Sequence, residues 1–351
     1  MLPPMAGLLA GSFFGSLGWV RPLSSWWPMV GWRTGLTTKA SSLQAEVLRS
    51  RHWRLGRTGP VPRRWSLRQY WRRAPTTPSR GRLQSSTDAS TCTQTWPVPP
   101  ANDALLREFY ISLGCALENL VLAARADGHQ PTVTLDPGNA PDLVATVDLE
   151  PGPSIRDQLY ESIGRRRSNR SEYTTDPVGP STLMAMDDLV DGSVAPAGWV
   201  WLDTEPARQT FAHLLDAATV AHVADEEQSE DSFAWWRSSW GEVQAHRDGL
   251  NIDGVGLPPL ITTLAKILPA PSRESADATF VERTRLQADT AAAFGVVTVD
   301  DPHALEAQLV GGRLLQRLHL WATANDLGFQ HMNQITERID RDRQQDRPSP
   351  F

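Results

Sequence analysis

The chain has little cysteine and no long apolar run. Only Cys92 and Cys115 occur in 351 residues, which excludes a disulfide-stapled fold. The sequence lacks a Cys-x-x-Cys pair and any His/Cys spacing typical of zinc, so we predict no metal site. Met5–Val20 is rich in glycine and serine and shorter than the roughly 20 residues that cross a bilayer. We therefore expect a cytoplasmic protein without membrane contact.

The first hundred residues also lack isoleucine, asparagine and most acidic side chains. They hold 14 Lys and Arg against 2 Asp and Glu, a balance of +12, and 8 of the 14 Trp. The remaining chain holds 20 against 38, a balance of −18, which gives the net charge of −6. Such a mixture is unusual for a packed domain, so we predict that residues 1–100 are irregular or disordered. The alternative is a nucleic-acid-binding arm, because basic and aromatic side chains suit phosphates and bases.

Beyond residue 101, hydrophobic periodicity predicts helices and short strands in alternation. The predicted helices are 103–126, 154–165, 206–223 and 305–324, and the predicted strands are 131–135, 143–149, 199–202 and 294–299. They follow no regular βαβ order, which favours the α+β class. The acidic run 225–231 is interpreted as a solvated surface.

Two segments 198 residues apart resemble each other. With Gly114 set on Gly312, the leucines and small residues of 114–128 and 312–326 coincide. The aligned pairs are Leu117 with Leu315, Leu120 with Leu318, Leu122 with Leu320, and Ala124 with Ala322. Any two amphipathic helices share a 3.6-residue period, so the likeness has two explanations, a common helical period or a duplicated domain.

A cluster of arginines follows the predicted helix 154–165. Four arginines occur within six residues, at Arg165, Arg166, Arg167 and Arg170, with Ser168 among them. Guanidinium forks and a hydroxyl suit a phosphate. The alternative is a solvated basic helix end, which the helix dipole favours.

The segment Ile163–Tyr173 resembles the flavin phosphate-binding motif of the nitroreductase family, Arg-Arg-Ser-x-Arg followed by an aromatic residue. Residues 102–343 resemble the Acg-like branch, in which two nitroreductase halves are fused. The matching stretches are Arg107–Leu120, His246–Asp253, Ala293–Val296 and Leu327–Gln334. The resemblance implies a nitroreductase-type α+β fold with a first-half remnant at 101–155, a second half at 156–340 and a tail at 341–351.

The resemblance also implies FMN as cofactor and NAD(P)H as its transient reductant. The residues it places at the phosphate and ribityl chain are Arg166, Arg167, Ser168 and Arg170, and those at the isoalloxazine ring are Gln330, His331 and Asn333. His331 stands where the family usually has proline. Flavin carries out the hydride chemistry itself, so no catalytic side chain and no metal ligand is expected.

The implied activity passes hydride from NAD(P)H through FMN to a small-molecule electron acceptor. We expect a monomer with pseudo-dimeric halves or a homodimer, and no nucleic acid as partner. Two alternatives are a flavin-sequestering stress protein without turnover and a nucleic-acid binder that uses the basic arm.

One family string is missing from the first half. The string Ser-His-Asn-Thr-Gln-Pro-Trp contacts the flavin ring in the family, and its place is taken by Ala74–Gly81. One permitted coding of Ala74–Gly81, read from its third base, yields that string. The same shift over Gln84–Val98 yields a strand with a turn. We hypothesise that residues 64–97 are translated out of frame, which the nucleotide sequence of the gene would test.

Overall fold

The computed structural model describes residues 13–19, 82–85, 89–93, 100–136, 143–174, 176–237, 239–246, 249–256, 259–265 and 270–351. The chain divides into two units, and residues 21–66 form one of them. That unit lies outside the described residues, as does the proposed missing string at 74–81. The other unit, residues 1–20 with 67–351, is a mixed helix and strand structure.

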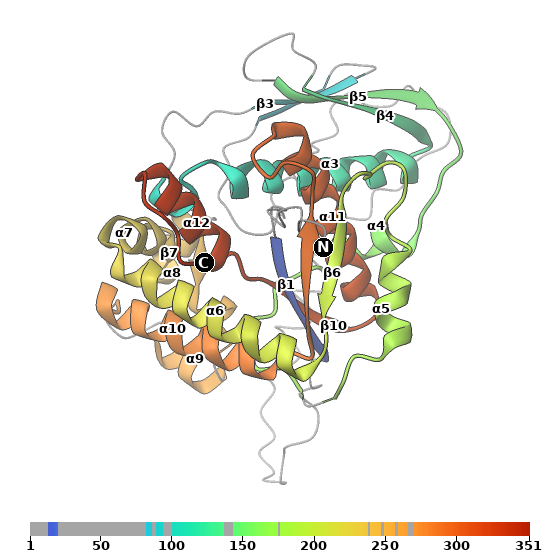
Figure 1. Ribbon diagram of the computed structural model, residues 1–351. Helices are drawn as coiled ribbons and strands as arrows, with labels where there is room; N and C mark the ends of the chain where they lie inside the picture. The colour runs from blue at the N-terminus through green and yellow to red at the C-terminus, as the bar shows by residue number, and fades with distance from the viewer. Residues whose placement is uncertain are drawn as a thin grey trace, which may run out of the picture. The chain divides into compact units, whose positions relative to one another are not determined.

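A first antiparallel sheet has the strand order β2-β3-β5-β4. Its strands are β2 (Arg82–Ser85), β3 (Ala89–Thr93), β4 (His129–Leu135) and β5 (Leu143–Pro151). The helix α3 (Arg107–Ala126) connects β3 to β4 and lies beneath this sheet (Figure 1). Alternate residues of β5 face α3, so that Val147 packs against Phe109 and Leu113.

A second antiparallel sheet has the order β10-β1-β9-β6. Its strands are β1 (Phe13–Trp19), β6 (Gly198–Leu202), β9 (Ala293–Thr298) and β10 (Leu327–His331). The helix α11 (Leu305–Ala324) connects β9 to β10. The strand order around α11 repeats the order around α3, with β1 in the position that β5 holds in the first sheet.

Three short segments of the first hundred residues are strands, and nearly all of the rest of that range lies outside the described residues. The strand β1 pairs with β9 and β10, β3 pairs with β5, and β2 pairs with β3. Backbone hydrogen bonds to neighbouring strands can stabilise a strand whose composition is unusual. The hairpin β2–β3 coincides with the place where the shifted reading also gives a strand and a turn, so this hairpin is compatible with both reading frames.

The repeat that the sequence suggests is present as a pair of equivalent helices. Both α3 and α11 are 20 residues long, and their bounds differ by 198 at each end. A Cβ atom on Gly114 would lie 2.2 Å from the carbonyl oxygen of Leu309, and one on Gly312 would lie 2.2 Å from that of Ile111. These two contacts are equivalent under the 198-residue offset. The helices therefore meet as two copies of one surface, as in an isologous dimer.

Buried polar contacts between α3 and α11 follow the same symmetry. Gln316 Nε2 donates to Asn119 Oδ1 at 2.7 Å, and Arg317 Nε donates to Glu118 Oε1 at 2.6 Å. Under the offset, Asn119 corresponds to Arg317 and Glu118 to Gln316, so each pair is the counterpart of the other. This reciprocity supports duplication rather than a shared helical period alone.

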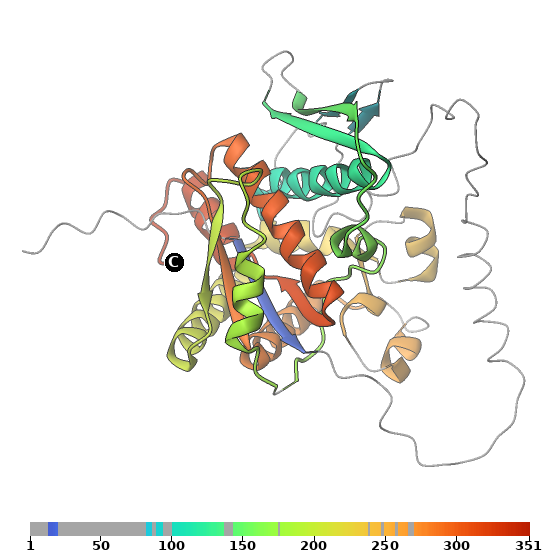
Figure 2. The ribbon, with the colours of Figure 1, turned by 90° about the vertical axis from the view of Figure 1, so that its right-hand side faces the viewer.

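Three further helices pack on the other face of the second sheet, opposite α11. They are α6 (Glu205–Ala224), α10 (Arg273–Thr290) and α12 (Gln334–Gln344) (Figure 1), and Figure 2 shows the same ribbon turned by 90°. Phe211, Leu215 and Phe294 form the core there. Among the described residues, α3 alone is long and apolar enough to cross a membrane, and most of it is buried inside the protein. It occupies the position of a core helix.

Most predicted elements beyond residue 101 are confirmed. The helix predicted at 305–324 has those bounds, and 206–223 differs from α6 by one residue at each end. The helix predicted at 154–165 is wrong in length, because α4 spans only Gln158–Ser162. The Asp157 side chain accepts the Tyr160 amide and fixes a later start, and Gly164 follows the end. The segment expected as a tail begins inside α12.

Candidate anion-binding site

Residues 165–170, called the arginine segment below, follow α4 and lie along the β10 edge of the second sheet. Ile163 is buried between Leu122 of α3 and Leu320 of α11, which anchors the start of the segment. The Asn169 amide then donates to the Phe329 carbonyl at 2.8 Å. The segment therefore lies against β10, within reach of side chains from α11.

His319 of α11 holds the segment in place. Arg166 Nη1 lies 3.2 Å from His319 Nδ1, and the Arg167 carbonyl lies 3.0 Å from His319 Nε2. Because guanidinium only donates, Nδ1 accepts and Nε2 carries the proton. Burial, and then the charge of Arg166, hold the pKa of His319 well below its ordinary value. A neutral imidazole stacked on Phe329 at 4.8 Å thus fixes the first arginine of the site.

His331 of β10 is the most unusual residue of this region. Its side chain is buried, and neither ring nitrogen has a hydrogen-bond partner among the described residues. Burial, and then the charges of Arg166 and Arg170, lower the pKa of His331 to about 3. A buried polar group without a partner costs about 1–3 kcal/mol. Such a group calls for an explanation, and a bound ligand is one.

Arg170 completes the cluster from the other end of the segment. Its side chain is largely buried, and burial lowers its pKa, although an arginine remains charged at any physiological pH. Its carbonyl accepts from Gln287 Nε2 at 2.6 Å and from Arg283 Nη2 at 3.2 Å, both on α10. Side chains of α10 therefore hold the backbone of Arg170. The charge of the Arg170 guanidinium contributes to lowering the pKa of His331.

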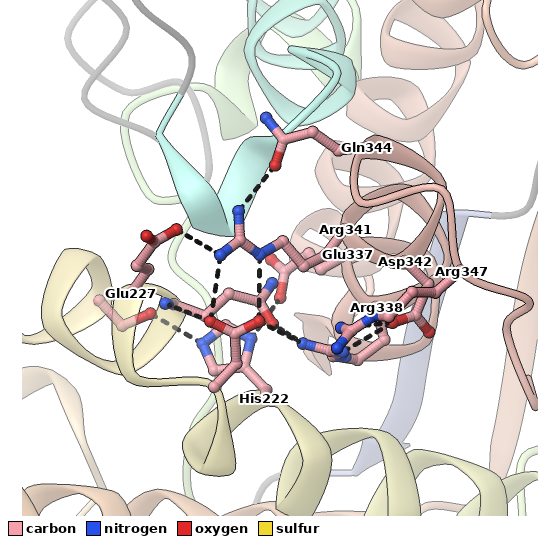
Figure 3. A network of polar contacts seen from close by, with 11 residues as sticks. His222, Glu227, Glu337, Arg338, Arg341, Asp342, Gln344 and Arg347 are labelled. Carbon is pink, nitrogen blue, oxygen red and sulfur yellow. Dashed lines mark hydrogen bonds and ion pairs between the residues drawn. The ribbon is translucent and has the colours of Figure 1, made fainter.

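Several arginines elsewhere in the described chain have carboxylate partners. One such network surrounds Arg338 and Arg341 of α12 (Figure 3). Both arginines contact Asp225, at 3.1 and 3.0 Å respectively. Burial alone would raise the pKa of Asp225, but hydrogen bonds from Arg341, the Gln228 amide and Arg338 outweigh it and hold the value at about 2. The surroundings of His331 differ, because the charged groups acting on it are two arginines.

The same network corrects the interpretation of the acidic run 225–231. Asp225 caps the helix α7 (Glu226–Ala234) and is mostly covered by the two arginines of α12, while Gln228 and Ser229 are buried. Part of the run 225–231 is therefore buried in a contact with α12, and only part of it is a solvated surface. The sequence could not show this, because the arginines lie more than a hundred residues away.

The predicted site residues divide into two groups. Arg166, Arg170 and His331 act on one another in one cluster. Arg167 takes part through its carbonyl, while its side chain is exposed, and Ser168 is half-buried.

Gln330 and Asn333 lie apart from this cluster. Successive strand residues face opposite sides, so Gln330 shares the side of Met332, which packs with α6 and α10. Asn333 precedes α12, and its Nδ2 donates to the buried Glu108 of α3. Gln330 Oε1 is buried without a partner among the described residues.

Three further residues shape the site without having been predicted for it. His319 lies in the predicted helix 305–324, and Arg283 and Gln287 lie on a helix that periodicity did not predict. Their roles depend on contacts between segments more than a hundred residues apart, for which the sequence carries no local signal.

Comparison with models of known protein families and with curated protein sequences finds no match for this chain.

Proposed function

We propose that the protein binds FMN through Arg166, Arg170 and His331 and acts as a nitroreductase-like oxidoreductase. Hydride would pass from NAD(P)H through the flavin to a small-molecule electron acceptor. The observation that supports this most is the buried His331, whose two unpartnered nitrogens lie under the charge of two arginines.

The donor set suits a phosphate ester that carries hydroxyl groups. Guanidinium groups donate to phosphate oxygens as charge-assisted hydrogen bonds. A neutral imidazole offers one donor and one acceptor nitrogen, so His331 would be satisfied by a phosphate oxygen on one side and a hydroxyl on the other. FMN provides both through its phosphate and ribityl chain, whereas sulfate or chloride provides only acceptors.

The duplicated architecture also supports a nitroreductase-type fold of two fused halves. The reciprocal contacts of α3 and α11 support a monomer whose halves pair like two subunits. The positions of Gln330 and Asn333 give less support, since they lie outside the cluster, so we assign the ring contacts to no side chain here.

Bound FMN would supply the hydride-accepting chemistry, and the protein would bind and orient it. In this proposal Arg166 and Arg170 hold the phosphate, and His319 keeps Arg166 in position through its Nδ1 contact. His319 and the Phe329 ring on which it stacks are both buried, so the hydrogen bond to Arg166 lies in surroundings of low dielectric constant.

The test is a flavin titration of the full chain. We expect FMN to bind with quenched fluorescence, and the pair Arg166→Ala and Arg170→Ala to weaken binding at least a hundredfold, because each loses a charge-assisted contact of about 1.5–3 kcal/mol. Arg285→Ala is the matched control, since Arg285 is exposed and paired with Asp216 at 2.5 Å.

The outcomes separate the alternatives. Bleaching of bound FMN by NADH or NADPH would support turnover, and a flavin that stays oxidised would support storage. A colourless protein that retains nucleic acid would overturn the proposal in favour of the basic segment, most of which lies outside the described residues.

A further inference from the structure

The helix α10 carries a row of polar side chains that holds the backbone after the arginine segment. Arg283, Gln287 and Thr290 follow the i, i+4, i+7 spacing of one helix face. Gln287 and Arg283 donate to the Arg170 carbonyl, and Thr290 Oγ1 accepts the Tyr173 amide at 3.1 Å. This face fixes the chain from residue 170 to residue 173.

Arg283 also reaches a second segment. The same Nη2 atom donates to the Gly256 carbonyl at 3.0 Å as well as to the Arg170 carbonyl at 3.2 Å. Gly256 closes the segment 249–256, which contains the strand β8 (Leu250–Asn251) and the 3-10 turn η2 (Ile252–Gly254). One guanidinium nitrogen therefore joins this segment to the arginine segment.

The junction at Gly256 is a close contact between backbones. Gly256 has φ +72°, and a Cβ atom there would lie 2.5 Å from the Arg170 carbonyl oxygen and 2.7 Å from the Ser171 amide nitrogen. The positive φ and the lack of space both require glycine at this position. Any side chain at 256 would displace the peptide that follows Arg170.

The other end of the segment is anchored independently. Gly249 has φ +73°, and the Leu250 amide donates to the Trp235 carbonyl at 2.9 Å. Arg237 of the strand β7 (Trp236–Arg237) pairs with Asn251. The segment 249–256 is thus attached at residue 250 to Trp235, which follows α7. At residue 256 Arg283 attaches it to the Arg170 peptide of the candidate site.

Arg283 and its neighbour Arg285 differ in their hydrogen-bond acceptors. The acceptors of Arg283 are two main-chain carbonyls, and its Nε is buried without a partner among the described residues. Arg285 is exposed and forms two hydrogen bonds with Asp216. A guanidinium that binds carbonyls of two separate segments connects them, whereas a surface ion pair contributes little.

We infer that Arg283 is a positioning residue that holds the segment 249–256 against the Arg170 peptide and so slows ligand release from the anion site. The inference rests on the proposed function for the identity of the ligand, FMN. It concerns the rate of release, since Arg283 acts through the backbone of Arg170 rather than on the phosphate itself.

The test compares Arg283→Gln, Arg283→Lys and the control Arg285→Gln in the full chain. We expect Arg283→Gln to raise the FMN dissociation rate about tenfold, as the loss of one bridging pair of hydrogen bonds would do, with the association rate within about twofold of wild type. Arg283→Lys keeps a cationic donor and should restore part of the effect, and Arg285→Gln should match wild type. An unchanged dissociation rate in Arg283→Gln would overturn the inference.

A second readout is independent of FMN. In the ligand-free protein, amide hydrogen exchange should accelerate both at 250–256 and at 170–173 in Arg283→Gln, because both segments lose the same anchor. If wild type binds no FMN, the proposed function fails while the exchange experiment still tests the link. Arg283→Lys is the alternative variant should Arg283→Gln not fold, and exchange that accelerates in one segment alone would contradict the link.

Discussion

Within the described residues, the regions around α3 and α11 share one strand order, yet the cluster of Arg166, Arg170 and His331 lies in the second region. Under the 198-residue offset, His319 and His331 of the second half correspond to Val121 and Val133 of the first. Val121 is buried in α3, and Val133 packs beneath the first sheet. Equivalent backbone positions thus carry buried imidazoles in one half and aliphatic side chains in the other. The fold provides equivalent positions, and the side chains at these positions give the two copies different chemistry.

The largest expected effect concerns the helix contact that both halves share. Glu118 is fully buried and binds Arg313 at 2.8 Å and Arg317 at 2.6 Å. Replacing Glu118 by Gln leaves the buried Arg313 without a carboxylate and leaves Arg317 with only the more exposed Asp191 at 2.8 Å, so we expect a loss of about 3–5 kcal/mol in the free energy of unfolding. The measurement is urea unfolding followed by circular dichroism.

The symmetric counterpart of this contact provides the control. Asn119→Ala removes the neutral pair with Gln316, for which we expect a loss of about 1–3 kcal/mol. Equal losses of unfolding free energy in Glu118→Gln and Asn119→Ala would show that the charged pair adds no more stability than the neutral one.

The sequence predicted both helices and the 198-residue alignment between them, but it did not predict that they contact each other or which polar contacts surround them. Apolar periodicity predicted α11 to the residue, and the glycines at 114 and 312 indicated the alignment. Periodicity depends on local spacing, which the chain displays directly. The bridge from Arg283 to Gly256 and the burial of His331 arise from segments brought together by folding. The motif predicted Arg166 and Arg170 as site residues. The contacts that α10 and α11 make with this segment were seen only in the structure.

The effect of intermediate size is on the pH dependence of stability. One buried group in each half, Asp103 and His331, should change the free energy of unfolding in opposite directions with pH. Burial raises the pKa of Asp103, before α3, to about 7, although hydrogen bonds from the Phe109 and Glu108 amides oppose this. Its contribution to stability is present below about pH 4 and is lost as pH rises through 7. The depressed pKa of His331 acts the other way, because its contribution is present above about pH 6.5 and is lost as pH falls toward 3.

Two variants separate these contributions. Between pH 6.5 and 4.5, wild type should lose about 2 kcal/mol relative to His331→Leu, and it should gain about 2 kcal/mol relative to Asp103→Asn. Urea unfolding across this range measures both differences. The exposed counterpart Asp301→Asn is the control for Asp103, since its carboxylate stays in water. Difference curves of the same sign would contradict the assignment.

The smallest expected effect compares the residues that follow α3 and α11. Gly128 has φ +82°, and its counterpart Asp326 has φ +56°. A Cβ atom on Gly128 would meet only the Gly152 carbonyl oxygen at an ordinary 3.5 Å, so a substitution there costs conformational strain rather than a clash. We therefore expect Gly128→Ala to lose about 1 kcal/mol, whereas Asp326→Gly should stay within about 0.5 kcal/mol of wild type, because relief of strain offsets the entropy that glycine loses on folding. Urea unfolding of both variants measures the difference. A loss above 3 kcal/mol for Gly128→Ala would show that the first half is packed more tightly at this turn than the second, and that the two copies have diverged in their backbones as well as in their side chains.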